Sequence, residues 1–149
     1  MSTADGPVLV CFAVKEEAAP FRRGLPPNVS LLVTGMGPTA AERAVKARLA
    51  EREWSLVLTC GFAGGLNPVL PIGVVLADTD EDFPLRPALL AAGAQPGSFH
   101  CAEQVAVTAY EKAMLRERTG ADAVEMESGI IRQLCRQRGL PSATVRVIS

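Results

Sequence analysis

The sequence of 149 residues predicts an α/β fold, in which three layers form a sandwich around a central mixed, largely parallel sheet. Apolar runs typical of strands alternate with helix-like segments along the chain. Several of these runs are apolar at almost every position, which is typical of central strands covered on both faces. Since the length suits one hydrophobic core and no repeat or linker is visible, a single domain over residues 1–149 is expected.

The first half of the chain predicts four strands and one long helix. Strands are expected at residues 8–14, 28–34, 55–60 and 72–77, and a helix at 39–51. Pro26 and Pro27 break the chain before the second strand, and Glu42 and Lys46 have the spacing of an ion pair on one helix face. The glycines of CGFAGGL, residues 60–66, predict a tight turn between the third and fourth strands.

The second half begins with a weak signal and ends with clear elements. Residues 78–99 suggest a loop with one short helical turn, and residues 105–107 a short strand. Thr108 and Glu111 match a capping box that opens a helix ending at Gly120. A short strand at 121–125, an amphipathic helix at 127–138 and a closing strand at 142–148 follow.

The composition argues against several kinds of partner. The net charge is −1 and the acids and bases are interspersed, so neither nucleic acid nor an anionic membrane is an expected partner. The charge-free stretch 55–77 is long enough for a membrane span, but its glycines and prolines would break a spanning helix. Four cysteines without a CxxC pair, and a lone His100, argue against a metal site. We expect reduced thiols, a cytoplasmic location, no signal peptide and no cofactor.

Three features at the ends of strands have side chains or backbone suited to chemistry. The glycines of residues 60–66 allow close backbone approach to a ligand, or form only a turn. Glu17, in Lys15-Glu16-Glu17 after the first strand, is placed to activate water, or simply begins a solvated helix. In AVEMESGIIRQLC, residues 123–135, Glu127 either binds a ligand at a helix start or only caps that helix. Glu125 is expected on the edge or the opposite face of its strand.

Taken together and in order, these features resemble the purine and uridine phosphorylase family, which includes the nucleosidases that cleave methylthioadenosine and S-adenosylhomocysteine. The sequences of the segments FAGGLNP and TGADAVEMES most resemble those of the hopanoid-associated phosphorylase branch. The matching segments are LVCFAVKEEAAPF (9–21), LLVTGMG (31–37), LTCGFAGGLNPVLPIGVVLAD (58–78), TGADAVEMES (119–128) and ATVRVIS (143–149). The resemblance implies a nucleoside phosphorylase-like fold, and cleavage of the N-glycosidic bond of a purine nucleoside by phosphate or water.

The resemblance also implies roles for individual residues. Glu127 would accept hydrogen bonds from the ribose hydroxyls while Met126 packs against the sugar, and Glu17 would orient or deprotonate the attacking water. Backbone groups of Ala63 and Gly64 would lie near the nucleophile, with Gly35 beside that pocket. Val105 and Ala106 would hold the base, and no metal or cofactor is implied. Members of the family commonly form dimers, trimers or hexamers, so a homo-oligomer is expected.

The sequence also departs from the family pattern. Phe62 stands where relatives often carry a serine or threonine that binds phosphate, and Lys15-Glu16-Glu17 replaces an arginine used by some phosphorylases. The family places an aspartate that protonates the purine directly after the last strand, whereas this sequence ends at Ser149. We therefore expect a fold shortened at its C-terminal end and reduced activity. The alternatives are a non-catalytic relative that binds a nucleoside or only assembles, and an unrelated α/β binding module.

Overall fold

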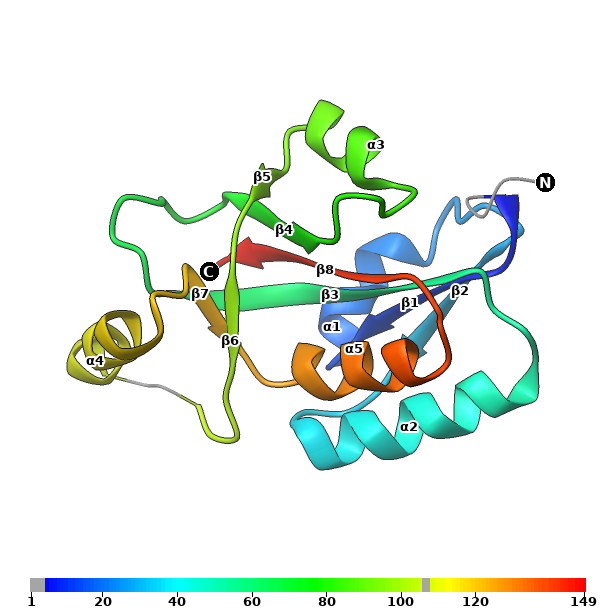
Figure 1. Cartoon of the computed structure of the whole chain (residues 1–149), viewed down its shortest axis with the longest axis horizontal. Helices are drawn as coiled ribbons and strands as arrows, with labels where there is room; N and C mark the ends of the chain where they lie inside the picture. Colours follow the sequence, from blue (N-terminus) through cyan, green and yellow to red (C-terminus); the bar gives the residue numbers. More distant parts are fainter. Residues whose placement is uncertain (1–4, 106–107) are drawn as a thin grey trace.

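The computed structural model describes residues 5–105 and 108–149 (Figure 1). Within them, eight strands form one sheet. The strands are β1 (Val8–Phe12), β2 (Val29–Val33), β3 (Leu56–Gly65), β4 (Val75–Thr79), β5 (Gln95–Pro96), β6 (Phe99–Cys101), β7 (Ala123–Glu125) and β8 (Ser142–Ile148). The helices are α1 (Lys15–Ala18), the 3-10 turn η2 (Ala19–Phe21), α2 (Pro38–Glu51), α3 (Arg86–Ala91), α4 (Ala109–Thr119) and α5 (Ser128–Gln137).

The sheet is mixed and largely parallel, as the sequence predicts. Its main path has the order β2-β1-β3-β8-β4-β5, and the four strands β2, β1, β3 and β8 run parallel. β4 is antiparallel to β8 and parallel to β5. Away from this path, β7 pairs antiparallel with the end of β3 and parallel with β6. The long strand β3 therefore joins the central sheet to the β6–β7 pair.

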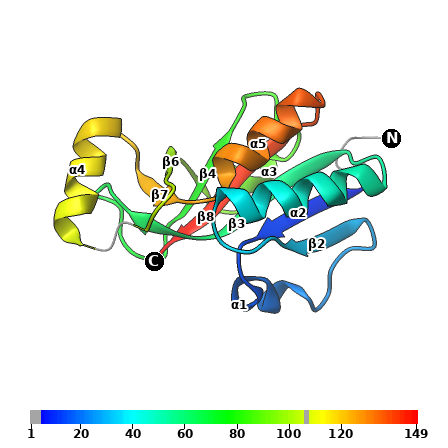
Figure 2. The same ribbon diagram turned by 90° about the horizontal axis from the view of Figure 1, so that it is seen from below.

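Side chains of the central strands alternate between two apolar layers. Leu9 and Val57 belong to a buried cluster that includes Val45 of α2 and Ile131 of α5. Val8, next to Leu9 in sequence, belongs instead to a cluster formed with residues of the segment around α3. Figure 2 shows α2 and α5 on one face of the sheet and α1 on the other. The helices therefore cover both faces, which gives the predicted three-layer sandwich.

Several elements match the sequence prediction closely. β8 has the predicted bounds. α2 begins one residue earlier than predicted, and α5 is shorter than predicted by one residue at each end. α4 begins with the predicted capping box: the Glu111 N–H donates to the Thr108 hydroxyl at 3.0 Å, and the Thr108 N–H donates to the Glu111 carboxylate at 3.4 Å. Gly120 ends this helix in the left-handed conformation, with φ 71°. The Lys46–Glu42 ion pair forms at 2.7 Å.

Other expectations were wrong. Residues 60–65 form no turn, because β3 continues through them, paired with β8 as far as Ala63 and with β7 at Gly64 and Gly65. β4 begins at Val75 rather than at residue 72. The short helical turn expected within 78–99 is α3, but β5 and the start of β6 in the same segment were not foreseen. Val105 lies outside any strand, and the rest of the strand expected at 105–107 lies outside the described residues.

Two further observations concern the whole described chain. No helix in residues 5–105 or 108–149 has the length and apolar character needed to cross a membrane. The four cysteines are free thiols: Cys11 and Cys135 are buried, whereas Cys60 and Cys101 are partly exposed.

Candidate functional site

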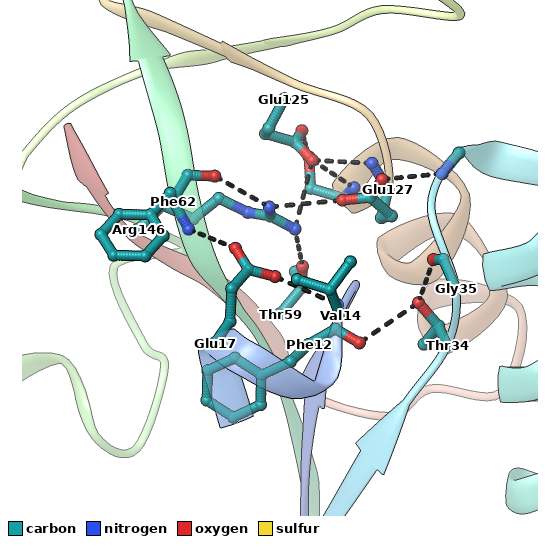
Figure 3. Close-up of polar contacts among 12 residues, drawn as sticks. Phe12, Val14, Glu17, Thr34, Gly35, Thr59, Phe62, Glu125, Glu127 and Arg146 are labelled. Carbon is teal, nitrogen blue, oxygen red and sulfur yellow. Dashed lines mark hydrogen bonds and ion pairs between the residues drawn. The ribbon is translucent and has the colours of Figure 1, made fainter. Parts of the chain in front are cut away.

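Glu17 lies at the carboxyl ends of two neighbouring parallel strands. It is the third residue of α1, the short helix that follows β1. Its Oε1 atom accepts a hydrogen bond from the Val14 N–H at 3.2 Å, so the side chain caps its own helix. Its Oε2 atom accepts a second hydrogen bond from the Phe62 N–H of β3 at 2.7 Å (Figure 3). Two backbone donors therefore fix the carboxylate between β1 and β3.

Gly61 permits this approach of Glu17 to β3. Its φ of 131° lies in the region that glycine adopts readily and other residues avoid. A Cβ atom added there would lie 2.8 Å from the Cδ atom of Glu17 and would overlap its carboxylate oxygens. Gly61, the first glycine of the CGFAGGL segment, thus allows the Glu17 side chain to come close to the backbone of β3 and does not form a turn.

Glu125 is buried, with 5% of its surface exposed. Its Oε2 atom accepts hydrogen bonds from the N–H groups of Glu127 and Ser128, both at 2.8 Å, and its Oε1 atom accepts one from the Ser128 hydroxyl. These are free donors at the start of α5. The expectation that Glu125 lies on a strand edge or the opposite face was therefore wrong, because the chain leaves β7 at this residue and turns into α5 around its carboxylate.

Glu127 is equally buried, with 4% exposed, and is held by a different element. Its Oε2 atom accepts a hydrogen bond from the Gly37 N–H, at the start of α2, at 2.8 Å. Burial raises the pKa of the Glu127 carboxyl above 4.5. The Gly37 N–H and the nearby charge of Arg146 oppose this rise in pKa, whereas Glu125 and Glu17 add to it.

Arg146 of β8 connects the two buried glutamates. Its guanidinium lies 3.3 Å from the Glu125 carboxylate and 3.3 Å from the Glu127 carboxylate, and only 2% of its side chain is exposed. It also donates to the Thr59 hydroxyl at 2.8 Å and to the Phe62 carbonyl at 3.3 Å, while its buried Nε has no partner among the described residues (Figure 3). Sequence reasoning missed Arg146 as a site residue. Glu125 and Glu127 could have indicated that such a residue exists, since buried carboxylates require a cation or hydrogen-bond donors nearby.

These groups border one cavity of about 380 Å³. Six of the residues singled out from the sequence line it, namely Glu17, Ala63, Gly64, Val105, Met126 and Glu127. Gly35 does not line it, but its N–H donates to the carbonyl of Ala13, which does line it. The neighbouring Met36 also lines the cavity. Ala106, expected beside Val105, lies outside the described residues.

Other residues that line the same cavity include Phe62, Lys112, Glu125, Arg146 and Ser149. Phe62 is 55% exposed, although its backbone is held in β3. The cavity wall therefore contains three carboxylates and a buried arginine, together with aromatic and aliphatic side chains. Such a site can hold a small polar molecule and stabilise a developing positive charge.

Comparisons with known proteins identify the family of this chain. The sequence model of the phosphorylase superfamily matches residues 88–149. The futalosine hydrolase of Streptomyces coelicolor is 32% identical over an alignment of 160 positions, which covers 84% of this chain and 68% of that protein.

Solved structures share the fold at low sequence identity. A mutant methylthioadenosine nucleosidase of Helicobacter pylori, with 5′-methylthioadenosine in its active site, has a TM-score of 0.85 at 17% identity, covering 97% of this chain and 85% of that one. Futalosine hydrolase of the same organism has a TM-score of 0.84 at 17% identity, covering 97% and 87%. A nucleosidase of Colwellia psychrerythraea in complex with adenine has a TM-score of 0.80 at 20% identity, covering 97% and 82%. The chain belongs to the phosphorylase superfamily, the family of the purine and uridine phosphorylases and of the methylthioadenosine and S-adenosylhomocysteine nucleosidases.

Proposed function

We propose that this protein hydrolyses the N-glycosidic bond of a purine nucleoside. The observation that carries the proposal is the placement of two carboxylates, Glu17 and Glu127, on the wall of one cavity, each fixed by backbone N–H groups of another element. Cleavage of this bond passes through a state that resembles an oxocarbenium ion, and fixed carboxylates stabilise such a cation.

Glu127 is proposed to bind the sugar. One of its oxygens accepts from Gly37 and the other faces Arg146, and each carboxylate oxygen has a second lone pair that can accept from a ribose hydroxyl. Met126 lines the cavity beside it and offers an apolar surface to the ribose ring. Arg146 acts as a positioning residue, because its charge favours the ionised form of Glu127 against the effect of burial.

Water, rather than phosphate, is the nucleophile in this proposal. Glu17 is held at the cavity wall, where its carboxylate can orient a water molecule or accept its proton. The Phe62 N–H, a donor that an anion would need, already binds Glu17. A phosphate placed there would meet two carboxylates and the Phe62 ring, and both terminal nitrogens of Arg146 are engaged by protein oxygens. The identity of 32% to a futalosine hydrolase supports the same choice.

The test is incubation of the full chain with inosine, adenosine, methylthioadenosine and futalosine, with and without phosphate. We expect release of free base in buffer without phosphate. Glu17→Gln and Glu127→Gln should each lower kcat/KM by about 10²–10⁴-fold. Glu16→Gln, which changes the exposed neighbour of Glu17, is the matched control and should retain wild-type activity.

Two outcomes would contradict the proposal. Release of base only in the presence of phosphate would indicate a phosphorylase. Binding of nucleosides without release of base under any condition would indicate a non-catalytic relative, the alternative that the sequence leaves open.

We also propose that the protein is a homo-oligomer that acts in the cytoplasm. Val69 and Ile72, in the loop between β3 and β4, are each 82% exposed, and apolar side chains so exposed are common at interfaces between subunits. Light scattering at micromolar concentration should give a mass that is a multiple of the 15.7 kDa chain. A monomer would contradict the proposed assembly without bearing on hydrolysis.

A further inference from the structure

A second cavity lies at the C-terminal ends of α2 and α5. These two helices lie side by side on one face of the sheet, and both end on the same side of the molecule (Figures 1 and 2). The cavity has a volume of about 470 Å³, which is typical of sites for small molecules. None of its lining residues borders the cavity that contains Glu17 and Glu127. It is therefore separate from the proposed site of hydrolysis.

Two arginines without partners line this cavity. Arg52 is the C-cap residue of α2, and Arg138 is the C-cap residue of α5. Across residues 5–105 and 108–149, neither guanidinium group has a hydrogen bond or an ion pair. By contrast, Arg48, one turn earlier in α2, is paired with Glu51 at 3.4 Å. The helix dipole favours cations at both C-termini, but this interaction leaves the N–H groups of the two arginines available to a ligand.

The same cavity has a rigid apolar surface. Trp54 is half-buried, and its Nε1–H donates to the Arg48 carbonyl at 3.2 Å, so the position of its ring is fixed. The guanidinium carbon of Arg52 lies 5.4 Å from the centre of the Trp54 ring. This cation–π contact restrains Arg52 without using its N–H groups as donors. Leu49 and Leu140 also line the cavity, and both belong to the apolar layer beneath α2 and α5.

The charges on the wall indicate an anion with a single charge. The exposed Glu53 also lines the cavity, so two guanidinium groups and one carboxylate leave one net positive charge. The free carbonyl groups at the ends of α2 and α5 add partial negative charge. A dianion such as a phosphate monoester would meet more repulsion here than a carboxylate would.

We infer that this cavity binds a small aromatic carboxylate. The planar N–H groups of Arg52 and Arg138 match the two oxygens of a carboxylate. The indole of Trp54 and the two leucine side chains offer an apolar surface to an aromatic ring. This ligand site does not depend on the proposed hydrolysis, because none of its residues takes part in that reaction.

Titration calorimetry of the full chain with benzoate, benzamide and phenyl phosphate tests the inference. Benzoate should bind most tightly, phenyl phosphate more weakly, and benzamide, which lacks the charge, least. Arg52→Gln and Arg138→Gln should each weaken benzoate binding roughly 10-fold, as expected for a lost hydrogen bond between charged groups. Glu53→Gln should strengthen the binding of phenyl phosphate. Arg43→Gln, at an exposed position of α2 outside the cavity, is the matched control and should leave benzoate binding unchanged.

Fluorescence locates the bound ligand, because Trp54 is the only tryptophan of the chain. Benzoate should change the Trp54 emission in a saturable way, with the dissociation constant that calorimetry gives. Glu127→Gln should leave this titration unchanged, whereas binding at the proposed site of hydrolysis would be altered by it. Circular dichroism should show folded variants, since Arg52, Glu53 and Arg138 are exposed.

Three outcomes would overturn the inference. Benzoate binding that is unchanged in both folded arginine variants would show that Arg52 and Arg138 do not hold the carboxylate. Equal binding of benzamide and benzoate would show that the charge of the ligand is not recognised. Tighter binding of phenyl phosphate than of benzoate would assign the cavity to phosphate esters in place of carboxylates.

Discussion

The carboxylate of Glu17 occupies the space that a side chain at residue 61 would fill. A Cβ atom on Gly61 would lie 2.8 Å from the Glu17 Cδ atom, and the backbone there has a φ of 131°. The position of Glu17, the proposed general base, thus depends on a residue of β3 that has no side chain. Glycine at this position serves the site as well as the strand.

Gly61→Ala should therefore lower both stability and activity. The alanine must adopt an unfavourable backbone conformation, at a cost of about 1–3 kcal/mol, and must displace Glu17. A displacement of about 1 Å is enough to reduce the rate roughly 10²-fold. Chemical denaturation and assays of base release measure the two effects.

Gly93→Ala is the matched control for Gly61→Ala. Gly93 also has a positive φ, 109°, but a Cβ atom there meets nothing within 4 Å. This variant should lose stability and keep wild-type activity. Equal activity in the two variants would show that Glu17 is not held by the absence of a side chain at Gly61.

Replacement of Arg146 should destabilise the fold strongly. Arg146→Met leaves the buried carboxylates of Glu125 and Glu127 without their cation, and removal of one partner of a buried ion pair costs about 3–5 kcal/mol. Arg43→Met, at an exposed position of α2, should change the free energy of unfolding by no more than about 0.5 kcal/mol. Denaturant titration compares the two variants. A loss below about 1 kcal/mol in Arg146→Met would contradict the importance of this ion cluster.

The pH dependence of stability should report the raised pKa of Glu127. Between pH 4.5 and that raised pKa, the folded chain binds more protons than the unfolded chain, so the contribution of Glu127 to the free energy of unfolding falls as pH rises. Glu127→Gln should remove this slope. Activity should change in the opposite sense and be lost as pH falls through the raised pKa, because the role proposed for Glu127 in sugar binding requires its carboxylate form. Identical pH–stability curves for the wild-type protein and Glu127→Gln would contradict the assignment.

Asp122 should show the opposite slope. Partial burial acts to raise its pKa, but hydrogen bonds from Asn67 and the Ser98 N–H, together with Arg116, outweigh this effect and bring the pKa below 3.8. Asp122 therefore contributes stability above pH 3.8, and this stability is lost as pH falls through the folded pKa. Asp122→Asn should flatten the acid limb of the pH–stability curve. A curve that keeps its acid limb in Asp122→Asn would count against these hydrogen bonds.

The four thiols should react slowly in the folded protein. Burial raises the pKa of Cys101 to about 11 and that of Cys60 to about 12. Thiolate is the reactive form, and at pH 8 a thiol of pKa 11 is about one-thousandth ionised. Titration with a disulfide reagent should modify Cys101 first, since Cys11 and Cys135 are buried, and unfolding should expose all four. Cys101→Ser should remove the earliest phase. Rapid labelling of a second thiol in the native state would contradict these environments.

Local signals predicted much of the fold. The bounds of α4 follow from Thr108, Glu111 and Gly120, which act within a few residues of one another. The third strand was ended too early because the glycines of residues 60–65 have a local preference for turns. Pairing with β8 on one side and β7 on the other overrides that preference, and neither partner is adjacent in sequence.

The site was predicted less completely than the fold. Glu17 and Glu127 were singled out because each follows a strand, where ligands commonly bind in α/β sheets. Arg146 was missed because its contacts with Glu125 and Glu127 join β8 to the segment between β7 and α5, and they depend on how these elements pack in the fold. Glu125 was misplaced because its partners, the N–H groups of Glu127 and Ser128, become available to it only where the chain turns from β7 into α5.

Strands β3 and β8 pair in parallel over seven residues of β3, from Val57 to Ala63, with Arg146 opposite Gly61. Successive side chains of a strand point to opposite faces, so a slip of one residue between these strands would turn Arg146 away from both carboxylates and leave the two buried glutamates without their ion-pair partner. The ion cluster thus penalises every incorrect register of the central strands. Arg146 and Glu127 therefore favour the native register of β3 and β8 as well as forming part of the proposed site. A mutation that removes either residue should weaken both the site and the preference for that register.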